Sequence, residues 1–309
     1  MNQNNKVAVI LTTFNGSKYI KQQIESIISQ SYSNWELFIR DDGSTDETVE
    51  IIKLYASADR RIHILQDDKG NLRSAQNFNA LMVKYKDVAD YFMFCDQDDI
   101  WLQKKIEQSL LKMMEIENNN SAIVYGPQIL IDSDGNILNH LANNFYYGID
   151  LKILLATNFI YGCTIIINRK LLLKCLDIPG SAENHDYWVV LVAAISKSSC
   201  GVLKEPLMLY RQHDNNVSGS YKDSSIKNRL KRLVSNNEIK MLGKRRKMFI
   251  DLLTRTESYI SFSDYDLIQQ YVNLMEKDRI SRLIFVIKNH IRKVSFLATV
   301  NYYWSIFRG

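Results

Sequence analysis

The sequence lacks the long hydrophobic runs that mark membrane-spanning and exported proteins. No stretch of eighteen consecutive apolar residues, the length that a membrane-spanning helix needs, occurs in the chain. The apolar run near the N-terminus is also shorter than a signal peptide requires. We therefore expect a cytoplasmic protein without a membrane span.

Glycine-rich nucleotide-binding motifs are absent as well. The sequence has no G-x-G-x-x-G and no G-x-x-x-x-G-K-[ST], so a dinucleotide cofactor and a P-loop ATPase both lack their expected sequence support. The four cysteines are widely spaced, without a C-x-x-C pair, and lie in apolar surroundings. This pattern predicts reduced cysteines in the core rather than a zinc or redox site.

What is present is the composition of a folded globular protein with an uneven charge. Apolar residues make up 46% and charged residues 24% of the chain, which excludes wholesale disorder. Residues 221–309 hold 18 Lys and Arg against 8 Asp and Glu, whereas residues 1–220 hold 21 against 26. Because the sequence pattern changes at the same point, we predict a domain over 1–220 and a basic helical region over 221–309.

The N-terminal third of the chain alternates between expected strands and expected helices. Strands separated by helical segments of roughly ten residues form βαβ units with a parallel sheet, so the expected fold class is α/β. Apolar runs predict strands at 6–12, 35–40, 62–66 and 91–95, and helical periodicity predicts helices at 18–29, 46–56 and 75–84.

Further strands and helices are predicted up to residue 220, and mainly helices are predicted after residue 224. The predicted helices are 102–117, 169–176 and 186–196, and the predicted strands are 122–126, 128–131, 158–168, 200–203 and 206–211. In the segment 158–168 a glycine precedes a β-branched run, so we expect close backbone approach near Gly162.

Three carboxylates follow directly after the strand predicted at 91–95. Asp96, Asp98 and Asp99 stand where open α/β sheets bind ligands, at the carboxyl end of a parallel strand. Carboxylates this close repel unless a cation lies between them, and hard oxygen ligands suit Mg²⁺ or Mn²⁺, especially an ion that holds a diphosphate. Asp99 has an alternative role as the cap of the next helix. We expect Trp101 to pack against the sheet.

Two other strands end in polar clusters, at residues 13–15 and at Asp41 and Asp42. The carboxyl ends of parallel strands meet at one edge of a sheet, so all three clusters should line one crevice. Such a crevice suits a nucleotide diphosphate. Asp41 or Asp42 would accept a hydrogen bond from a pyrimidine N–H or a ribose hydroxyl, and Asp98 would bind a metal that neutralises the diphosphate.

Five segments in order carry a family resemblance: VILTTFNGSKYI (9–20), DDGSTD (41–46), CDQDDIW (95–101), NHDYW (184–188) and LYRQHDNNVSG (209–219). Together they resemble the family 2 glycosyltransferases, and the third and fifth resemble the bacterial rhamnosyltransferase branch. The resemblance covers residues 1–220 and implies the GT-A fold, a Rossmann-like mixed sheet with helices on both faces. The C-terminal helical appendage carries no such signature.

The resemblance implies roles for the polar residues at the strand ends. Thr13, Asn15 and Asp41 would hold the nucleoside. Asp96 would contact the sugar of the nucleotide, and Asp98 would bind Mn²⁺ or Mg²⁺ through its carboxylate.

The later segments supply the remaining candidates. Asp186 would be the general base of a single displacement with inversion, although the residues alone favour a helix N-cap, and the family often has Glu-Asp where this chain has His185 and Asp186. His213 would close over the diphosphate or ligate the metal. Arg211 would pair with the phosphates or cover the surface. Arg73 is either a diphosphate contact or a solvated loop arginine.

These roles predict an inverting, metal-dependent glycosyltransferase. The donor would be a nucleotide-diphosphate sugar, with L-rhamnose from dTDP-rhamnose as the specific expectation, and the acceptor a hydroxyl of a surface polysaccharide or lipid-linked glycan. One alternative is a non-catalytic nucleotide-sugar-binding scaffold. Another is a nucleotidyltransferase, for which the glycine-rich, lysine-bearing entry loop is missing.

The basic C-terminal region admits two interpretations. The run 244–247 and the stretch 282–308 mix bases with aromatic residues, a combination typical of a helical segment on an anionic membrane surface, here the inner face of the cytoplasmic membrane. Alternatively, these residues are the solvated faces and core contacts of a small helical subdomain. We expect no nucleic-acid partner, because no binding motif is recognisable.

Overall fold

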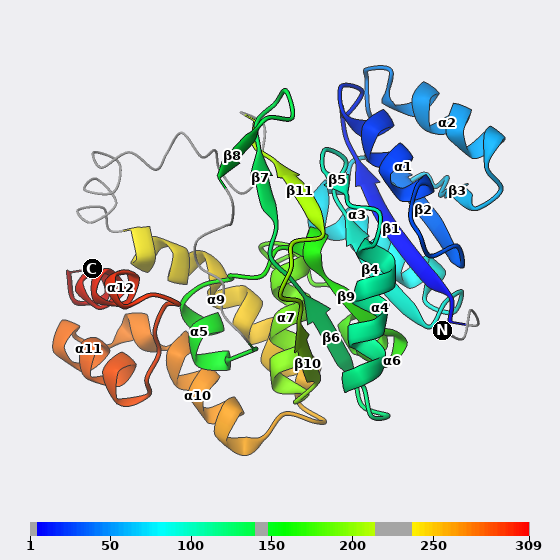
Figure 1. The fold of residues 1–309 in the computed structure, drawn as a ribbon. Coiled ribbons are helices and arrows are strands. Elements are labelled where there is room, and N and C mark those ends of the chain that lie inside the picture. Colours follow the sequence, from blue (N-terminus) through cyan, green and yellow to red (C-terminus); the bar gives the residue numbers. More distant parts are fainter. Residues whose placement is uncertain (1–4, 140–147, 214–236, 309) are drawn as a thin grey trace.

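A computed structural model describes residues 5–139, 148–213 and 237–308 (Figure 1). Its larger sheet has seven strands in the order β10-β6-β9-β4-β1-β2-β3. The strands of this sheet are β1 (Val7–Thr13), β2 (Trp35–Asp41), β3 (Ile62–Ile64), β4 (Tyr91–Cys95), β6 (Ala122–Tyr125), β9 (Ile166–Asn168) and β10 (Ser199–Val202).

The strand directions make this sheet mixed. β1 is parallel to both β2 and β4, and β2 is parallel to β3, as the alternation of strands and helices predicted. β9 runs antiparallel to its neighbours β4 and β6. The strand predicted at 158–168 was too long, because Gly162 begins a short 3₁₀ turn, η1 (Gly162–Thr164), and donates its N–H to the carboxylate of Asp186 instead of to a strand.

Helices cover both faces of the sheet, as expected. The side chains of β1 alternate: Val7, Val9 and Leu11 pack with α1 and α4, whereas Ala8 and Ile10 pack with α3 and α7. The helices up to residue 195 are α1 (Ile20–Ile28), α2 (Thr48–Ala58), α3 (Arg73–Tyr85), α4 (Lys105–Ile116), α5 (Leu151–Ala156), α6 (Arg169–Cys175) and α7 (His185–Ile195).

A smaller sheet in the order β5-β11-β7-β8 closes over the end of β4. Its strands are β5 (Ile100–Trp101), β7 (Ile129–Ile131), β8 (Ile137–Asn139) and β11 (Met208–Arg211). β5 follows the acids at 96–99 directly and pairs with β11. This pairing brings Arg211 and His213 next to the acids, and it delays the start of α4 to Lys105. Trp101 is 2% exposed in the core, as expected.

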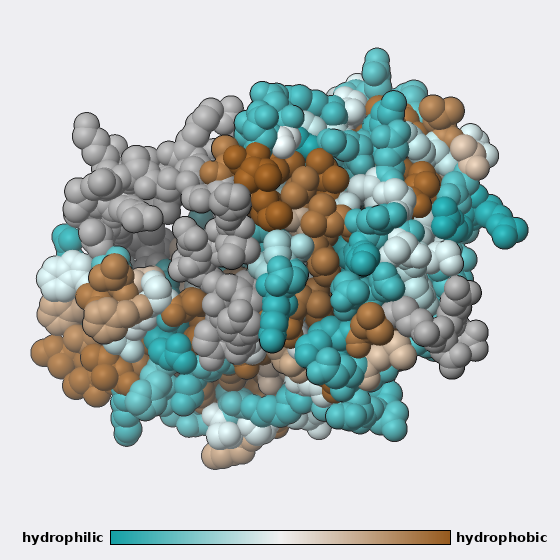
Figure 2. Space-filling view, viewed as in Figure 1, coloured by the Kyte–Doolittle hydropathy of each residue, from teal (hydrophilic) through white to brown (hydrophobic). Residues whose placement is uncertain are grey.

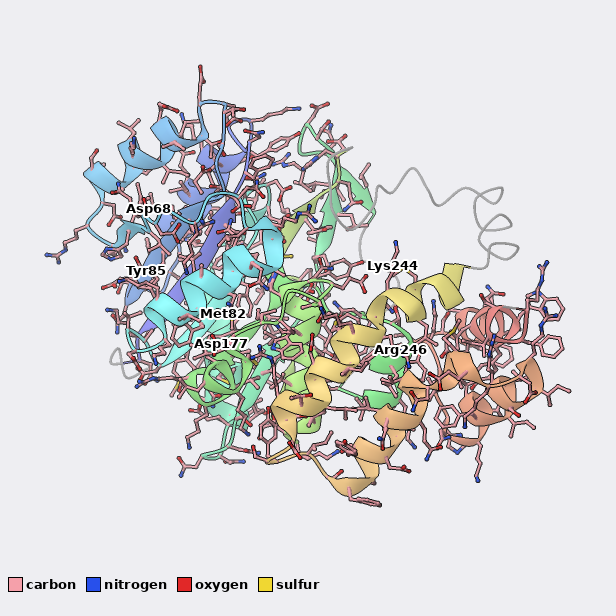
Figure 3. The ribbon with its side chains drawn as sticks, turned by 180° about the vertical axis from the view of Figure 1, so that it is seen from behind. Asp68, Met82, Tyr85, Asp177, Lys244 and Arg246 are labelled. Carbon is pink, nitrogen blue, oxygen red and sulfur yellow. The ribbon has the colours of Figure 1, made fainter. Side chains whose placement is uncertain are left out.

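Helices α9 to α12 lie together beside α5 and α7 (Figure 1). They are α9 (Asn237–Thr256), α10 (Phe262–Val272), α11 (Arg279–Lys288) and α12 (Phe296–Arg308), with a 3₁₀ turn η3 (Leu274–Glu276). Seen from behind, α9 with Lys244 and Arg246 lies on the same side of the molecule as α3 with Met82 (Figure 3). Buried residues of α9, such as Phe249, belong to the same hydrophobic cluster as α3 and α7.

The predicted C-terminal helical region is therefore present, but the proposed domain boundary at 220/221 lies outside the described residues. Among the helices that the structure describes, none is long and apolar enough to cross a membrane. All four cysteines have free thiols; Cys95, Cys163 and Cys175 are buried and Cys200 is half-buried.

Candidate active site

A cleft of about 1040 Å³ lies where β1, β2 and β4 end. The candidate residues that line it are Thr13, Asn15, Asp42, Arg73, Asp96, Asp98, Asp186 and His213, whereas Asp41 and Arg211 are not among its lining residues. The strand-end clusters meet because β1 lies between β2 and β4 and runs parallel to both.

Two predicted nucleoside-binding residues, at the ends of β1 and β2, are hydrogen-bonded to each other. Thr13 and Asp41 are register partners, and the Thr13 hydroxyl donates to Oδ1 of Asp41 at 2.8 Å. The other carboxylate oxygen of Asp41 accepts the N–H of Ser44 at 2.7 Å. Asn15, with a φ of 48°, accepts the N–H of Thr45 through its side-chain oxygen at 2.8 Å. These bonds fix two loops as one wall of the cleft.

Asp42 organises the beginning of α3. It is 3% exposed and accepts hydrogen bonds from the buried Arg40 guanidinium at 2.7 Å and from the N–H groups of Leu72 and Arg73 at 2.7 and 2.8 Å. Asp42 thereby ties the loop before α3 to β2. The exposed side chain of Arg73 lies at the cleft, where it adds positive charge.

The middle residue of the D-Q-D element has a structural function that the sequence did not predict. Gln97 accepts the N–H of Phe14 at 2.9 Å and donates to the carbonyl oxygen of Phe14 at 3.1 Å. A Cβ at Gly16 would lie 2.2 Å from Oε1 of Gln97, so a larger residue at this position would displace the Gln97 amide. Gln97 therefore joins the loop after β4 to the loop after β1.

Asp96 lies between two other acids of the cleft. Burial raises its pKa to about 7, and the negative charges of Asp98 and Asp186 contribute to the increase. A carboxyl group with this pKa exchanges its proton near neutral pH, so it can either accept a hydrogen bond from a hydroxyl or donate one.

Asp99 does not line the cleft and is 1% exposed. It accepts the N–H of Arg211 at 3.1 Å, and burial raises its pKa well above the usual range. The capping role considered for it is wrong, because the residue before α4 is Lys104 and its side chain makes no capping bond. The buried Lys105 donates to the carbonyl oxygen of Cys163 at 2.7 Å. The sequence did not predict a buried lysine here.

Asp98 and His213, the two candidate metal ligands, lie in contact with each other. Nε2 of His213 lies 2.7 Å from Oδ2 of Asp98, and both side chains are about 15% exposed, at 14% and 16%. The imidazole ring stacks on the ring of Tyr19, with centroids 5.2 Å apart. The stacking fixes the plane of the imidazole ring, and its Nε2 faces the carboxylate of Asp98.

Arg211 supports this pair from behind. It is 2% exposed, which corrects the interpretation that it covers the surface. Its Nε donates to the carbonyl oxygen of Asp98 at 2.8 Å, Nη2 donates to Gln22 at 2.6 Å, and the guanidinium lies over the ring of Tyr19. The guanidinium is thus directed at the protein and not at the cleft, and it fixes the backbone that carries Asp98.

Asp186 projects into the cleft from the first turn of α7. The N-cap residue of this helix is Asn184, so the interpretation of Asp186 as the N-cap is wrong. Its carboxylate accepts the N–H of Gly162 at 3.0 Å and the side-chain amide of Asn158 at 3.2 Å. Burial raises the pKa of Asp186 to about 6, against the opposing effect of the backbone hydrogen bonds. The predicted close approach at Gly162 is confirmed.

His185 is a residue of the cleft whose position the sequence did not reveal. It is 5% exposed, and its ring stacks on Phe78 at a centroid distance of 3.6 Å. A Cβ at Gly162 would lie 2.5 Å from Nε2 of His185. Within the described residues neither ring nitrogen has a hydrogen-bond partner, and burial lowers the pKa of this histidine to about 3. The ring is therefore neutral and holds the base of α7 against α3.

Comparison with known proteins identifies relatives of this chain. A family model described as Glycosyl transferase family 2 matches residues 8–176. An uncharacterized glycosyltransferase of Rickettsia bellii is 27% identical over 88% of this chain, and the match spans 39% of the length of that relative. A dTDP-rhamnosyl transferase, RfbG, of Shigella flexneri is 30% identical over 72% of this chain and 78% of its own length.

Solved structures share the fold. The mannosyltransferase PcManGT from Pyrobaculum calidifontis, solved with GDP-Man and Mn²⁺, superposes with a TM-score of 0.56 and 12% identity over 98% of this chain and 86% of its own. At this identity the likeness establishes the fold, which is the GT-A fold that the sequence motifs implied.

Proposed function

Since the chain belongs to glycosyl transferase family 2, we propose that it transfers a sugar from a nucleotide-diphosphate donor to an acceptor hydroxyl, with inversion at the anomeric carbon. One observation carries the proposal. The carboxylate of Asp186 shares a cleft with Asp96, Asp98 and His213, although these residues come from three distant parts of the chain.

Asp186 is the proposed general base. Its carboxylate takes the proton of the acceptor hydroxyl while the acceptor oxygen bonds to the anomeric carbon. The bond from that carbon to the diphosphate oxygen breaks, and the nucleoside diphosphate leaves. A pKa of about 6 suits this step, because the group is ionised at neutral pH and still basic enough to accept a proton. The hydrogen bonds from Asn158 and Gly162 orient the carboxylate.

Asp98 and His213 are the proposed ligands of Mn²⁺ or Mg²⁺. A carboxylate oxygen suits both ions, whereas an imidazole nitrogen suits Mn²⁺ better than the harder Mg²⁺. The ligand atoms of Asp96, Asp99 and Cys163 also lie within 4.8 Å of one another. That group fits less well, because burial raises the pKa of the Cys163 thiol and of Asp99 and so disfavours the ionised forms that bind a cation. A bound ion would supply positive charge to the leaving diphosphate.

The wall at the ends of β1 and β2 is the proposed nucleoside site. Thr13 and Asn15 reach the cleft there, and Asp41 and Asp42 hold the two loops in place. The proposed function of Arg73 is to face the diphosphate, because its exposed guanidinium lines the same cleft. The shared fold with a mannosyltransferase solved with GDP-Man supports a nucleotide-sugar donor for this chain.

The finer proposal is that the donor is dTDP-L-rhamnose and the acceptor a surface polysaccharide or lipid-linked glycan at the inner face of the cytoplasmic membrane. Its support is the 30% identity to a dTDP-rhamnosyl transferase. The assignment of Asp186 as the base does not depend on which sugar or which acceptor the protein uses.

The test is donor turnover by the purified chain with Mn²⁺ and dTDP-rhamnose, UDP-glucose, UDP-N-acetylglucosamine or GDP-mannose. We expect release of nucleoside diphosphate with at least one donor, and a decrease of about 10²- to 10⁴-fold in Asp186→Asn. Donor binding, measured by thermal shift, should persist in this variant. Binding without turnover by the unaltered chain would support the scaffold alternative, and pyrophosphate release from a nucleoside triphosphate would support a nucleotidyltransferase.

A further inference from the structure

Helices α11 and α12 present a hydrophobic surface that no described part of the chain covers. Figure 2 shows it at the lower left, over the position of these two helices in Figure 1. We call this surface the α11–α12 face. It consists of seven large apolar side chains with exposed fractions between 47% and 81%: Ile280, Ile284 and Ile287 from α11, and Phe296, Leu297, Val300 and Trp304 from α12.

The spacing of these residues explains why they share one side. Steps of three and four residues place side chains on one stripe of a helix. The opposite stripes of the same helices are already used, because Phe285, Val286, Tyr302 and Ile306 are buried in the main hydrophobic cluster. Each helix thus has two apolar sides. The inner side packs against the hydrophobic core, and the outer side is exposed. Contiguous apolar surface of this kind marks an interaction site.

The charge around the face indicates the partner. From residue 279 to residue 308 the chain has six basic residues and no acidic one. Arg279, Lys288 and Arg308 are exposed, whereas Arg292 pairs with Asp150. A second copy of the chain would oppose the same positive charges, so self-association through this face is disfavoured. An anionic surface with an apolar interior satisfies both the charge and the hydrophobic side chains.

We propose that the α11–α12 face binds the surface of an anionic phospholipid bilayer. Phe296, Leu297 and Trp304 enter the boundary between headgroups and acyl chains, and Lys288 and Arg308 contact lipid phosphates. The two helices have 10 and 13 residues, fewer than a bilayer-spanning helix needs, so they lie in the plane of the interface. The proposal rests on this surface alone and is independent of the transfer reaction.

Trp304 allows a direct measurement. It is 51% exposed, whereas Trp35, Trp101 and Trp188 are at most 2% exposed, so a change of tryptophan fluorescence on vesicle binding reports Trp304. With full-length protein and phosphatidylglycerol vesicles, we expect a shift to shorter wavelength and quenching by brominated acyl chains. Phosphatidylcholine vesicles should give a several-fold weaker response. No response to anionic vesicles would overturn the proposal.

Variants separate membrane binding from loss of folding. The double substitution Phe296→Ser, Leu297→Ser should reduce vesicle binding in co-sedimentation at least ten-fold at unchanged Tm, because both residues are exposed. The matched control is Leu54→Ser on α2, 68% exposed on another helix, which should bind as the unaltered chain does. Equal binding by the double variant would contradict the proposal. So would a dimer in gel filtration that the double substitution dissociates, since the face would then join two copies.

Discussion

Arg245 of α9 forms an ion pair with Glu183, three residues before the proposed base Asp186. The same guanidinium lies 5.1 Å from the ring centroid of Tyr187, on the other side of that base. Ser181 donates a hydrogen bond to Asp251, also from α9. The basic C-terminal region therefore holds the segment that leads into α7, the helix that carries the proposed base, although its sequence carries no family motif.

We predict that Arg245→Ala lowers kcat about ten-fold or more while the KM for the donor changes little. Loss of the ion pair loosens the start of α7, and small displacements of a catalytic group reduce rates strongly. The matched control is the neighbouring Arg246→Ala, because the partner of Arg246 is the 64% exposed Glu276 of η3 and not Glu183. Steady-state kinetics of the two variants measure the difference. Equal effects of both substitutions would contradict a specific role for Arg245.

The dependence of the rate on pH should show the ionisation of Asp186. Burial raises its pKa to about 6, so the carboxylate is available above this pH and protonated below it. We expect kcat/KM to fall about ten-fold per pH unit below pH 6 and to level off above it. The residual activity of Asp186→Asn should not show this decrease of kcat/KM below pH 6. A profile for this variant that matches that of the unaltered protein would assign the ionisation to another group.

Gly162→Ala should reduce turnover at least ten-fold, because its Cβ would lie 2.5 Å from Nε2 of His185 and 3.2 Å from Cβ of Asp186. One of these side chains must move, and the hydrogen bond from the Gly162 N–H to the base would be distorted. Gly180→Ala is the control, since nothing lies within 4 Å of its new Cβ. Comparison of kcat for the two variants tests the packing. If both retain full activity, the contact at Gly162 does not position the base.

Removal of the proposed metal ligand should abolish the effect of Mn²⁺ on donor binding. For the unaltered protein, donor with Mn²⁺ at a hundred times its Kd should stabilise the fold by about 2.7 kcal/mol. In Asp98→Asn this gain should be the same with Mn²⁺ as with a chelator. Asp68→Asn is the control, because Asp68 is an exposed loop residue (Figure 3). Thermal unfolding of all three proteins, each with Mn²⁺ and with a chelator, measures these gains. A gain that still depends on Mn²⁺ in Asp98→Asn would assign the metal to other ligands.

Much of the catalytic half of the molecule followed from the sequence alone. Strands and helices alternate with a hydrophobic periodicity that each segment carries locally, so β4 was predicted with its bounds and the sheet with its layers. The acids Asp96 and Asp98 were placed correctly, because any polar residue directly after a parallel strand must lie at that edge of the sheet.

Tertiary structure alone decided which partners those acids have. Pairing of β5 with β11 brings His213 to Asp98 across 115 residues of sequence and buries Arg211 behind them. The orientation of Asp186 depends on Asn158 and Gly162, and the segment before it on Arg245. Local periodicity contains no record of such contacts, because they form between side chains that meet only when the chain has folded.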